Sequence, residues 1–173
     1  MRSRLLLFAA SLLIAFEVVQ GIGHDACVAS TKSSAFSFPL VANGKAATLL
    51  VGSNDWPGVQ RAAQDFSSDV GKVTGHALTV LNATSSLTVA KGSSPVIIVG
   101  TLGHSALIDA VLLASNGSAS DISALQGQWE AYSAKLVTLP GVGSAYVIVG
   151  SDKRGAIYGL YELSEQVRAV LRF

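Results

Sequence analysis

Charge is scarce in this sequence, and neither sign gathers into a run. Only 13% of the 173 residues are charged, with 12 Lys or Arg against 11 Asp or Glu. The absence of a basic patch argues against nucleic acid as a partner. The chain also has a single cysteine, Cys27, which excludes an intrachain disulfide. One cysteine in an exported chain leaves open an intermolecular bond, a free thiol or a partner outside this chain.

Several catalytic and cofactor-binding patterns are missing. The sequence has no G-x-S-x-G elbow for a Ser-His-Asp hydrolase and no metal-ligand cluster, so we expect neither a metal nor a cofactor. Residues 100–103, Gly-Thr-Leu-Gly, resemble an anion-binding loop in outline. They lack the full dinucleotide fingerprint and the Gly-Lys-Ser/Thr ending of a P-loop, which favours a tight strand-to-helix turn instead.

Long hydrophobic runs are also lacking. The N-terminal run, Leu5–Phe16, falls short of the roughly 20 residues that a membrane-spanning helix needs. It follows two arginines and precedes small residues, which is the pattern of a secretory signal peptide. We therefore expect a signal peptide at 1–21, a flexible leader at 22–34, and a secreted, extracellular protein without membrane attachment after cleavage. A retained anchor is the alternative, which Glu17 disfavours because it interrupts the run.

Two short patterns match the acceptor sequence for N-glycosylation. They begin at Asn82 and Asn116, each followed two positions later by Thr or Ser. Both lie in segments with a turn-like composition, so we expect glycosylation at these two residues in a eukaryotic secretory pathway.

Three apolar runs end in Val-Gly, and each gives way to a polar turn and then to a helical pattern. Their glycines are Gly52, Gly100 and Gly150. Such a run predicts a buried strand, and the glycine predicts a sharp backbone turn. If the strands are parallel neighbours, their turns gather at one edge of the sheet, where open α/β folds bind ligands. The sequence therefore predicts an α/β fold, a mixed sheet with helices on its faces and strand–turn–helix units after an N-terminal hairpin.

The spacing of apolar residues locates the elements within one domain at 35–166. Ala35–Leu40 and Ala46–Val51 flank an Asn-Gly pair, which predicts the hairpin. A first helix should have Asn54 or Asp55 as its N-cap, Pro57 in its first turn and Gly75 at its end. We further expect strands at 78–81, 95–99 and 145–149, an extended segment at 129–139, and helices at 104–113 and 154–166.

The first and third turns carry side chains suited to binding a sugar acid. They are Asn54, Asp55 and Trp56 after the first strand, and Asp152, Lys153 and Arg154 after the last. An aromatic face packs on a sugar ring, while Lys and Arg bind a carboxylate, Arg through a bidentate fork. The alternative packs Trp56 against the core and pairs Arg154 with Asp55 or Asp152.

Asp55 and Asp152 are also candidates for glycoside cleavage, which normally needs two carboxyl groups flanking the scissile bond. Both lie in turns that should share one edge of the sheet. The alternative is that Asp55 caps a helix and Asp152 hydrogen-bonds its own turn, since Asp is favoured at such positions regardless of catalysis.

Four segments of the sequence resemble the N-terminal domain of the α-glucuronidases of glycoside hydrolase family 115. They are Ser53–Ala63, Val99–Gly103, Gly127–Ala131 and, most specifically, Gly150–Gly159. The similarity runs in order, with family-like spacing, from about residue 46 to residue 166. It implies enzymes that remove glucuronic acid or its 4-O-methyl ether from xylan, with glucuronoxylan as the polysaccharide partner. It also implies an α/β domain followed by a TIM-like barrel and further C-terminal domains.

The sequence departs from the family after Gln166. There the family continues through a Trp-rich segment into the barrel, whereas this chain continues as Val167–Phe173, which we expect to be a non-family tail. Because the family's catalytic acids lie in the barrel, the resemblance assigns no catalytic residue here. We expect a secreted accessory domain, a fragment inactive alone, whose edge at 54–56 and 151–154 faces the missing barrel. A free-standing acidic-sugar-binding module and a non-functional truncated gene product are the alternatives.

Overall fold

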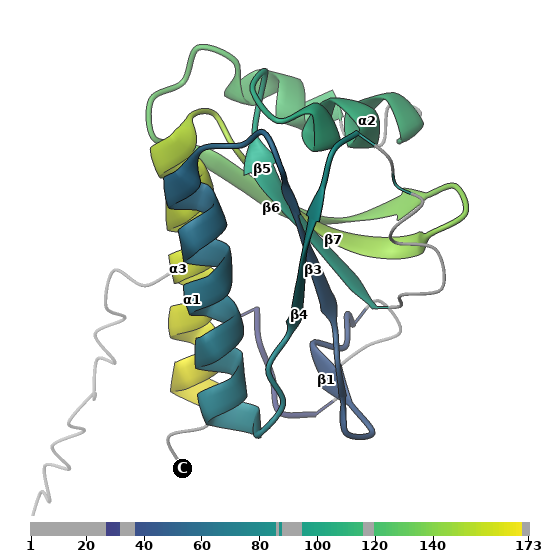
Figure 1. The fold of residues 1–173 in the computed structure, drawn as a ribbon, viewed down its shortest axis with the longest axis vertical. Coiled ribbons are helices and arrows are strands. Elements are labelled where there is room, and N and C mark those ends of the chain that lie inside the picture. The colour runs from purple at the N-terminus through teal and green to yellow at the C-terminus, as the bar shows by residue number, and fades with distance from the viewer. Residues whose placement is uncertain (1–26, 32–36, 86, 88–94, 116–119, 171–173) are drawn as a thin grey trace, which may run out of the picture.

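The fold is a mixed five-stranded sheet with helices on both faces and a short N-terminal hairpin beside it (Figure 1). The computed structural model describes residues 27–31, 37–85, 87, 95–115 and 120–170. The expected signal peptide, Asn116 and the last three residues of the expected tail lie outside the described residues. The α/β class predicted from the sequence is confirmed.

The strands follow the order β4-β3-β5-β7-β6. The first four are parallel to their neighbours, whereas β6 runs antiparallel to β7 at the opposite edge. Their bounds are Thr48–Gly52 for β3, Thr79–Ala83 for β4, Val96–Thr101 for β5, Tyr132–Leu139 for β6 and Gly143–Gly150 for β7. The three Val-Gly strands are therefore parallel neighbours, and their carboxyl ends meet at one edge.

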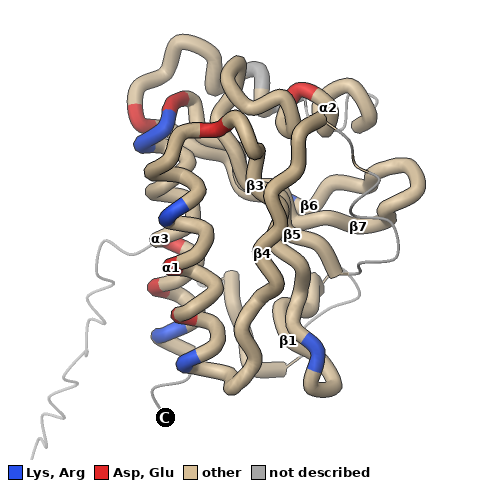
Figure 2. Tube along the Cα trace, in the orientation of Figure 1, with Lys and Arg blue, Asp and Glu red and all other residues tan. Residues whose placement is uncertain are grey.

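The helices form two layers around this sheet. α1 (Pro57–Thr74) and α3 (Lys153–Val170) lie side by side on one face, and α2 (Ala106–Ala114) packs on the other together with the 3₁₀ helix η2 (Ser120–Leu125) (Figure 1). Charged residues concentrate on α1, α3 and the loops at the strand ends, while β3, β5 and β7 carry none (Figure 2). Within the described residues, no helix combines the length and apolarity needed to cross a bilayer.

The side chains of the central strands alternate between two core layers, because successive strand residues point to opposite faces. Leu49 and Ile97 pack in the layer formed with α1 and α3, whereas Leu50 and Ile98 pack in the layer formed with α2. All four are fully buried. Burial of both faces explains why these strands are continuous apolar runs rather than alternating ones.

The hairpin is shorter than the sequence suggests. β1 (Val41–Ala42) pairs with β2 (Lys45–Ala46) across Asn43 and Gly44, whose φ angles of 52° and 72° fit the predicted Asn-Gly turn. The predicted second hairpin strand, 46–51, was wrong in its pairing. Most of it forms β3, which lies between β4 and β5, because two parallel partners and a helix layer on each face bury its apolar side chains completely.

Helix ends also differ from the expected positions. Trp56 is the N-cap of α1 and makes no side-chain capping bond, so neither Asn54 nor Asp55 caps this helix, while Pro57 and Gly75 occupy their predicted positions at its start and end. α2 begins at Ala106 rather than at residue 104. α3 continues beyond residue 166 to Val170, and Val167 packs in the core with 2% of its surface exposed.

The described part of the leader is attached to α3. The backbone N–H and the Sγ of Cys27 both donate to Oε1 of Gln166, at 2.9 and 2.8 Å. Val28 packs against the core layer of α1 and α3. Cys27 is exposed and forms no disulfide.

Candidate functional site

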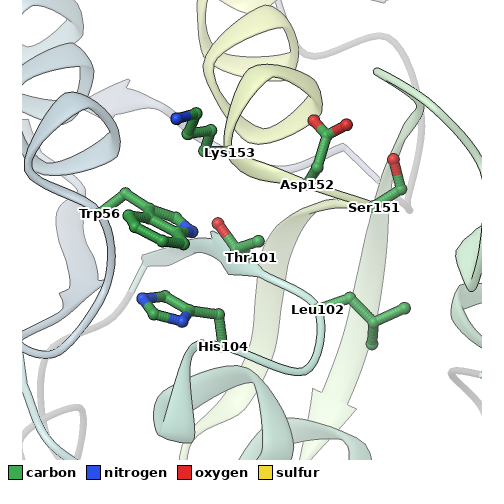
Figure 3. Close-up of a pocket in the computed structure, with 7 residues that line it drawn as sticks. All are labelled: Trp56, Thr101, Leu102, His104, Ser151, Asp152 and Lys153. Carbon is green, nitrogen blue, oxygen red and sulfur yellow. The ribbon is translucent and has the colours of Figure 1, made fainter.

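A pocket of about 300 Å³ lies at the carboxyl ends of β3, β5 and β7 (Figure 3). Its lining side chains come from the end of β5, the turns after the three strands and the start of α3: Trp56, Thr101, Leu102, His104, Ser151, Asp152 and Lys153. After β3 the chain passes over the α1 face to β4, whereas after β5 it passes over the α2 face toward β7. The pocket thus adjoins the point where the direction of winding reverses, which is where open α/β sheets bind ligands.

Asp55 links the turn after β3 to the end of β5 through hydrogen bonds. Its Oδ1 accepts hydrogen bonds from the backbone N–H of Trp56 at 2.7 Å and from the hydroxyl of Thr101 at 2.8 Å, while its Oδ2 accepts the backbone N–H of Thr101 at 2.8 Å. The residue is 4% exposed. With its oxygens engaged inside the protein, Asp55 serves as a link between the ends of β3 and β5.

Trp56 stands between two other side chains of the pocket (Figure 3). The imidazole of His104 stacks on one face of the indole, with ring centroids 4.2 Å apart and planes inclined by 11°. The Nζ of Lys153 lies over the ring, 5.3 Å from its centroid, on the side away from His104. Trp56 retains 40% exposure, so it is a surface residue of the pocket and does not pack into the core.

Asp152 caps α3 and anchors the loop before β6. Its Oδ1 accepts the backbone N–H groups of Arg154 at 2.9 Å and Gly155 at 2.8 Å, and its Oδ2 accepts that of Glu130 at 3.0 Å. Partial desolvation raises the pKa of Asp152, but these three hydrogen bonds and the charge of Arg154 together hold it below its ordinary value. The sequence-based alternative, in which Asp152 hydrogen-bonds its own turn, is confirmed.

Arg154 pairs with Glu130, which was not among the partners expected from the sequence. Its guanidinium pairs with the carboxylate of Glu130, and not with Asp55 or Asp152. Asn54 is held in turn by a 2.9 Å hydrogen bond from its Nδ2 to the carbonyl of His104. Neither Asn54 nor Arg154 lines the pocket, whereas Trp56, Asp152 and Lys153 do.

The Val-Gly glycines are needed for space rather than for a turned backbone. None of the three has a positive φ. A Cβ on Gly100 would lie 2.7 Å from Ile108, 2.8 Å from the Oγ of Ser105 and 2.9 Å from the Oδ2 of Asp55. A Cβ on Gly150 would collide with the backbone N of Ala156 at the start of α3. A turn or bend follows each of these glycines, but close approach of neighbouring atoms, and not a positive φ, is what excludes a side chain there.

Several solved structures are similar to this chain, and one of them illustrates the match. It is a family GH115 4-O-methyl-α-glucuronidase described as specific for decorated arabinogalactans, matched with 24% sequence identity and a TM-score of 0.48. The match covers 70% of this chain and 13% of that one, so the chain corresponds to a small part of the larger protein's length. No protein-family model matches the chain, and no curated protein does.

Ser151 belongs to the edge predicted at 151–154, but three other residues that line the pocket were not among the sequence-based site residues: Thr101, Leu102 and His104. They follow the second Val-Gly run, whose turn was interpreted as a tight strand-to-helix connection because it lacks the phosphate-binding fingerprints. The reasoning that gathers the three turns at one edge applies equally to this middle turn, so its polar residues were within reach of prediction. Asn82, an expected glycosylation site, lies exposed near the end of edge strand β4 rather than in a turn.

The two carboxylates near the pocket are engaged in hydrogen bonds within the protein. Asp55 and Asp152, the sequence-based candidates for a carboxyl pair, each accept three hydrogen bonds from the protein itself. In the described part of the chain, no group of three or more His, Cys, Asp or Glu side chains could hold a metal ion. The groups presented to a ligand are an aromatic ring, an ammonium group, an imidazole and hydroxyls.

Proposed function

We propose that this chain is the N-terminal α/β domain of a secreted xylan α-glucuronidase of glycoside hydrolase family 115. In this proposal its pocket binds the glucuronic acid groups that decorate glucuronoxylan. The bond cleavage itself belongs to the catalytic barrel that the family resemblance implies, and the domain acts as an accessory to it.

The observation that carries the proposal is where the four family-like segments lie. Ser53–Ala63 forms the turn after β3 and the start of α1, Val99–Gly103 ends β5, and Gly150–Gly159 ends β7 and begins α3. Gly127–Ala131 forms the loop whose backbone N–H groups bond Asp152 and Ser151. These segments supply every residue lining the pocket except His104, which follows the second of them directly. Segments that are far apart in the sequence thus meet around one pocket, which supports a ligand site in common with the family.

The side chains of the pocket suit an acidic sugar. Trp56 offers an aromatic surface for a sugar ring, and Lys153 offers a mobile positive charge for its carboxylate. The Oγ of Ser151 already accepts the backbone N–H of Ala131 at 3.0 Å, which leaves its hydroxyl proton to be donated to a sugar oxygen.

Titration calorimetry of the purified protein with an aldouronic acid tests the proposal. We expect binding heat with a Kd on the order of 1 mM, because one stacked ring and one charge-assisted contact provide modest affinity. Trp56→Ala should abolish the heat. Trp129→Ala is the matched control, since Trp129 is 79% exposed and lies outside the pocket lining. No heat with 10 mM (about ten times that Kd) would refute the proposal.

The same protein should release no glucuronic acid from glucuronoxylan. Retaining or inverting cleavage needs two carboxyl groups able to reach the glycosidic bond. Asp55 is buried, and the oxygens of Asp152 are taken by backbone N–H groups. Liberated uronic acid, measured by chromatography after prolonged incubation, would show that the chain has catalytic groups of its own and would contradict the accessory role.

A further inference from the structure

Both faces of the Trp56 indole are covered in the free protein, and the two covers differ in how firmly they are held. The backbone of His104 is held by two hydrogen bonds: its backbone N–H donates to the carbonyl of Thr101 at 3.2 Å, and its carbonyl accepts a hydrogen bond from Nδ2 of Asn54 at 2.9 Å. Its ring stacks in parallel on the indole. The His104 side of Trp56 is therefore closed to a ligand.

Lys153 covers the other face of the indole with a side chain that is free to move away. The residue is exposed, and its Nζ lies over the ring face, 5.3 Å from the ring centroid. Within the part of the chain that the structure describes, no carboxylate pairs with this ammonium. The neighbouring Asp152 carboxylate points away from the indole in Figure 3 and is bonded to backbone N–H groups. Arg154, the other cation of this turn, is paired with Glu130.

We propose that Lys153 is the residue that selects acidic over neutral sugars, by covering the free face of Trp56 until a carboxylate draws it away. This inference rests on the proposed function of the pocket. A neutral sugar that stacks on Trp56 displaces the ammonium and gives it no new partner. A uronic acid displaces the same ammonium but then accepts a charge-assisted hydrogen bond from it, so the same movement that opens the ring also completes the site.

The expected selectivity follows from the two interactions that are exchanged. An exposed cation–π contact is worth a factor of about two to five in binding, which a neutral sugar loses. A hydrogen bond between charged groups is worth a factor of about ten or more, which an acidic sugar gains. The protein should therefore bind a methyl glucuronoside at least about tenfold more tightly than the matching methyl glucoside.

The test uses the fluorescence of Trp56 in a Trp129→Phe background, where Trp56 is the one remaining tryptophan of the two in the sequence. Both methyl glycosides are titrated into this protein and into its Lys153→Met variant, which keeps the aliphatic stem and removes the charge. We expect Lys153→Met to weaken the glucuronoside, strengthen the glucoside and erase the difference. Lys45→Met, in the hairpin at the far end of β3, is the control and should leave the selectivity unchanged.

The outcomes separate this inference from the one on which it rests. Undiminished selectivity in Lys153→Met, or equal affinity of the parent protein for both sugars, would overturn the role of Lys153 and leave the pocket as a sugar site. No binding of either sugar to the parent protein would overturn the proposed function itself. Quenching of Trp56 by acrylamide in the free proteins gives an independent measure. It should increase when Lys153 is shortened to Ala and stay constant in Lys45→Met.

Discussion

Asp55 fixes the backbone position of Trp56, the aromatic residue of the pocket. Its carboxylate holds the backbone N–H of Trp56 with one oxygen and that of Thr101 with the other, so the ends of β3 and β5 are joined at the point where Trp56 meets His104. A buried carboxylate is costly unless it is fully hydrogen-bonded, and here backbone donors supply most of the compensation. The same carboxylate that sequence analysis offered for catalysis thus has a positioning role.

Replacement of Asp55 by Asn should destabilise the protein by about 2 kcal/mol. The amide nitrogen cannot accept a hydrogen bond, so one buried donor, either at Trp56 or at Thr101, loses its partner. Urea denaturation measures the loss. Thr101→Val is the matched control, because it removes the hydroxyl but keeps the backbone N–H bond, and it should cost about 1 kcal/mol. Equal stability of Asp55→Asn and the parent protein would show that the link between the two strands contributes nothing.

Among the elements, α3 is joined to the site at its first turn, because Asp152 caps its N-terminus while also holding the loop before β6. Hydrogen bonds to the ionised form keep the pKa of Asp152 below the ordinary value of 3.8. A carboxyl with a lowered folded-state pKa stabilises the protein in full above its unfolded-state pKa. That contribution declines as the pH falls through the folded-state pKa, because the folded protein must then take up the proton.

Asp152→Asn should therefore lower stability by about 1 kcal/mol near neutral pH, with a smaller difference from the parent protein at about pH 3. Asn still caps the helix through its carbonyl oxygen but meets the N–H of Glu130 with its amide nitrogen. Urea midpoints at the two pH values give the comparison. Asp65→Asn, on the exposed surface of α1, removes one negative charge elsewhere and reports the effect of net charge. A difference that stays constant with pH would contradict the role of the ionised carboxylate.

Local sequence predicted the elements better than their pairing. The apolar runs of β3, β5 and β7 and the Asn43-Gly44 turn were predictable because burial on both faces and positive φ leave clear marks on residue type. The residues of β3 do not indicate which strands it pairs with. The prediction that 46–51 forms the second strand of the hairpin was therefore wrong in its pairing, since β3 pairs with β4 and β5. In the site, the gathering of the three turns was predictable. The stacking of Trp56 on His104 and the pairing of Arg154 with Glu130 were not, because each joins segments brought together by the sheet.

At the scale of the whole molecule, α3 contributes to stability along its entire described length. Its first turn borders the pocket, its middle packs beside α1, where Ser164 donates to Asp69 at 2.6 Å, and its last turns place Val167 in the core. Gln166 of the same region binds Cys27 of the leader. The domain boundary expected at residue 166 therefore falls inside a helix that completes the core layer of α1 and α3.

Val167→Ala should lower the free energy of unfolding by about 2 kcal/mol, because two buried methyl groups are removed and a small cavity remains. A chain ending after Gln166 should lose at least as much, since the last helical turn goes with the valine. Ala169→Ser is the control on the exposed side of the same turn and should change stability by less than about 0.5 kcal/mol. Urea denaturation followed by far-ultraviolet circular dichroism gives the free energy of unfolding of the parent protein and of the three variants. If Val167→Ala and the shortened chain unfolded at the parent midpoint, the core of this domain would end before residue 167, and the last turns of α3 would be dispensable to the fold that carries the pocket.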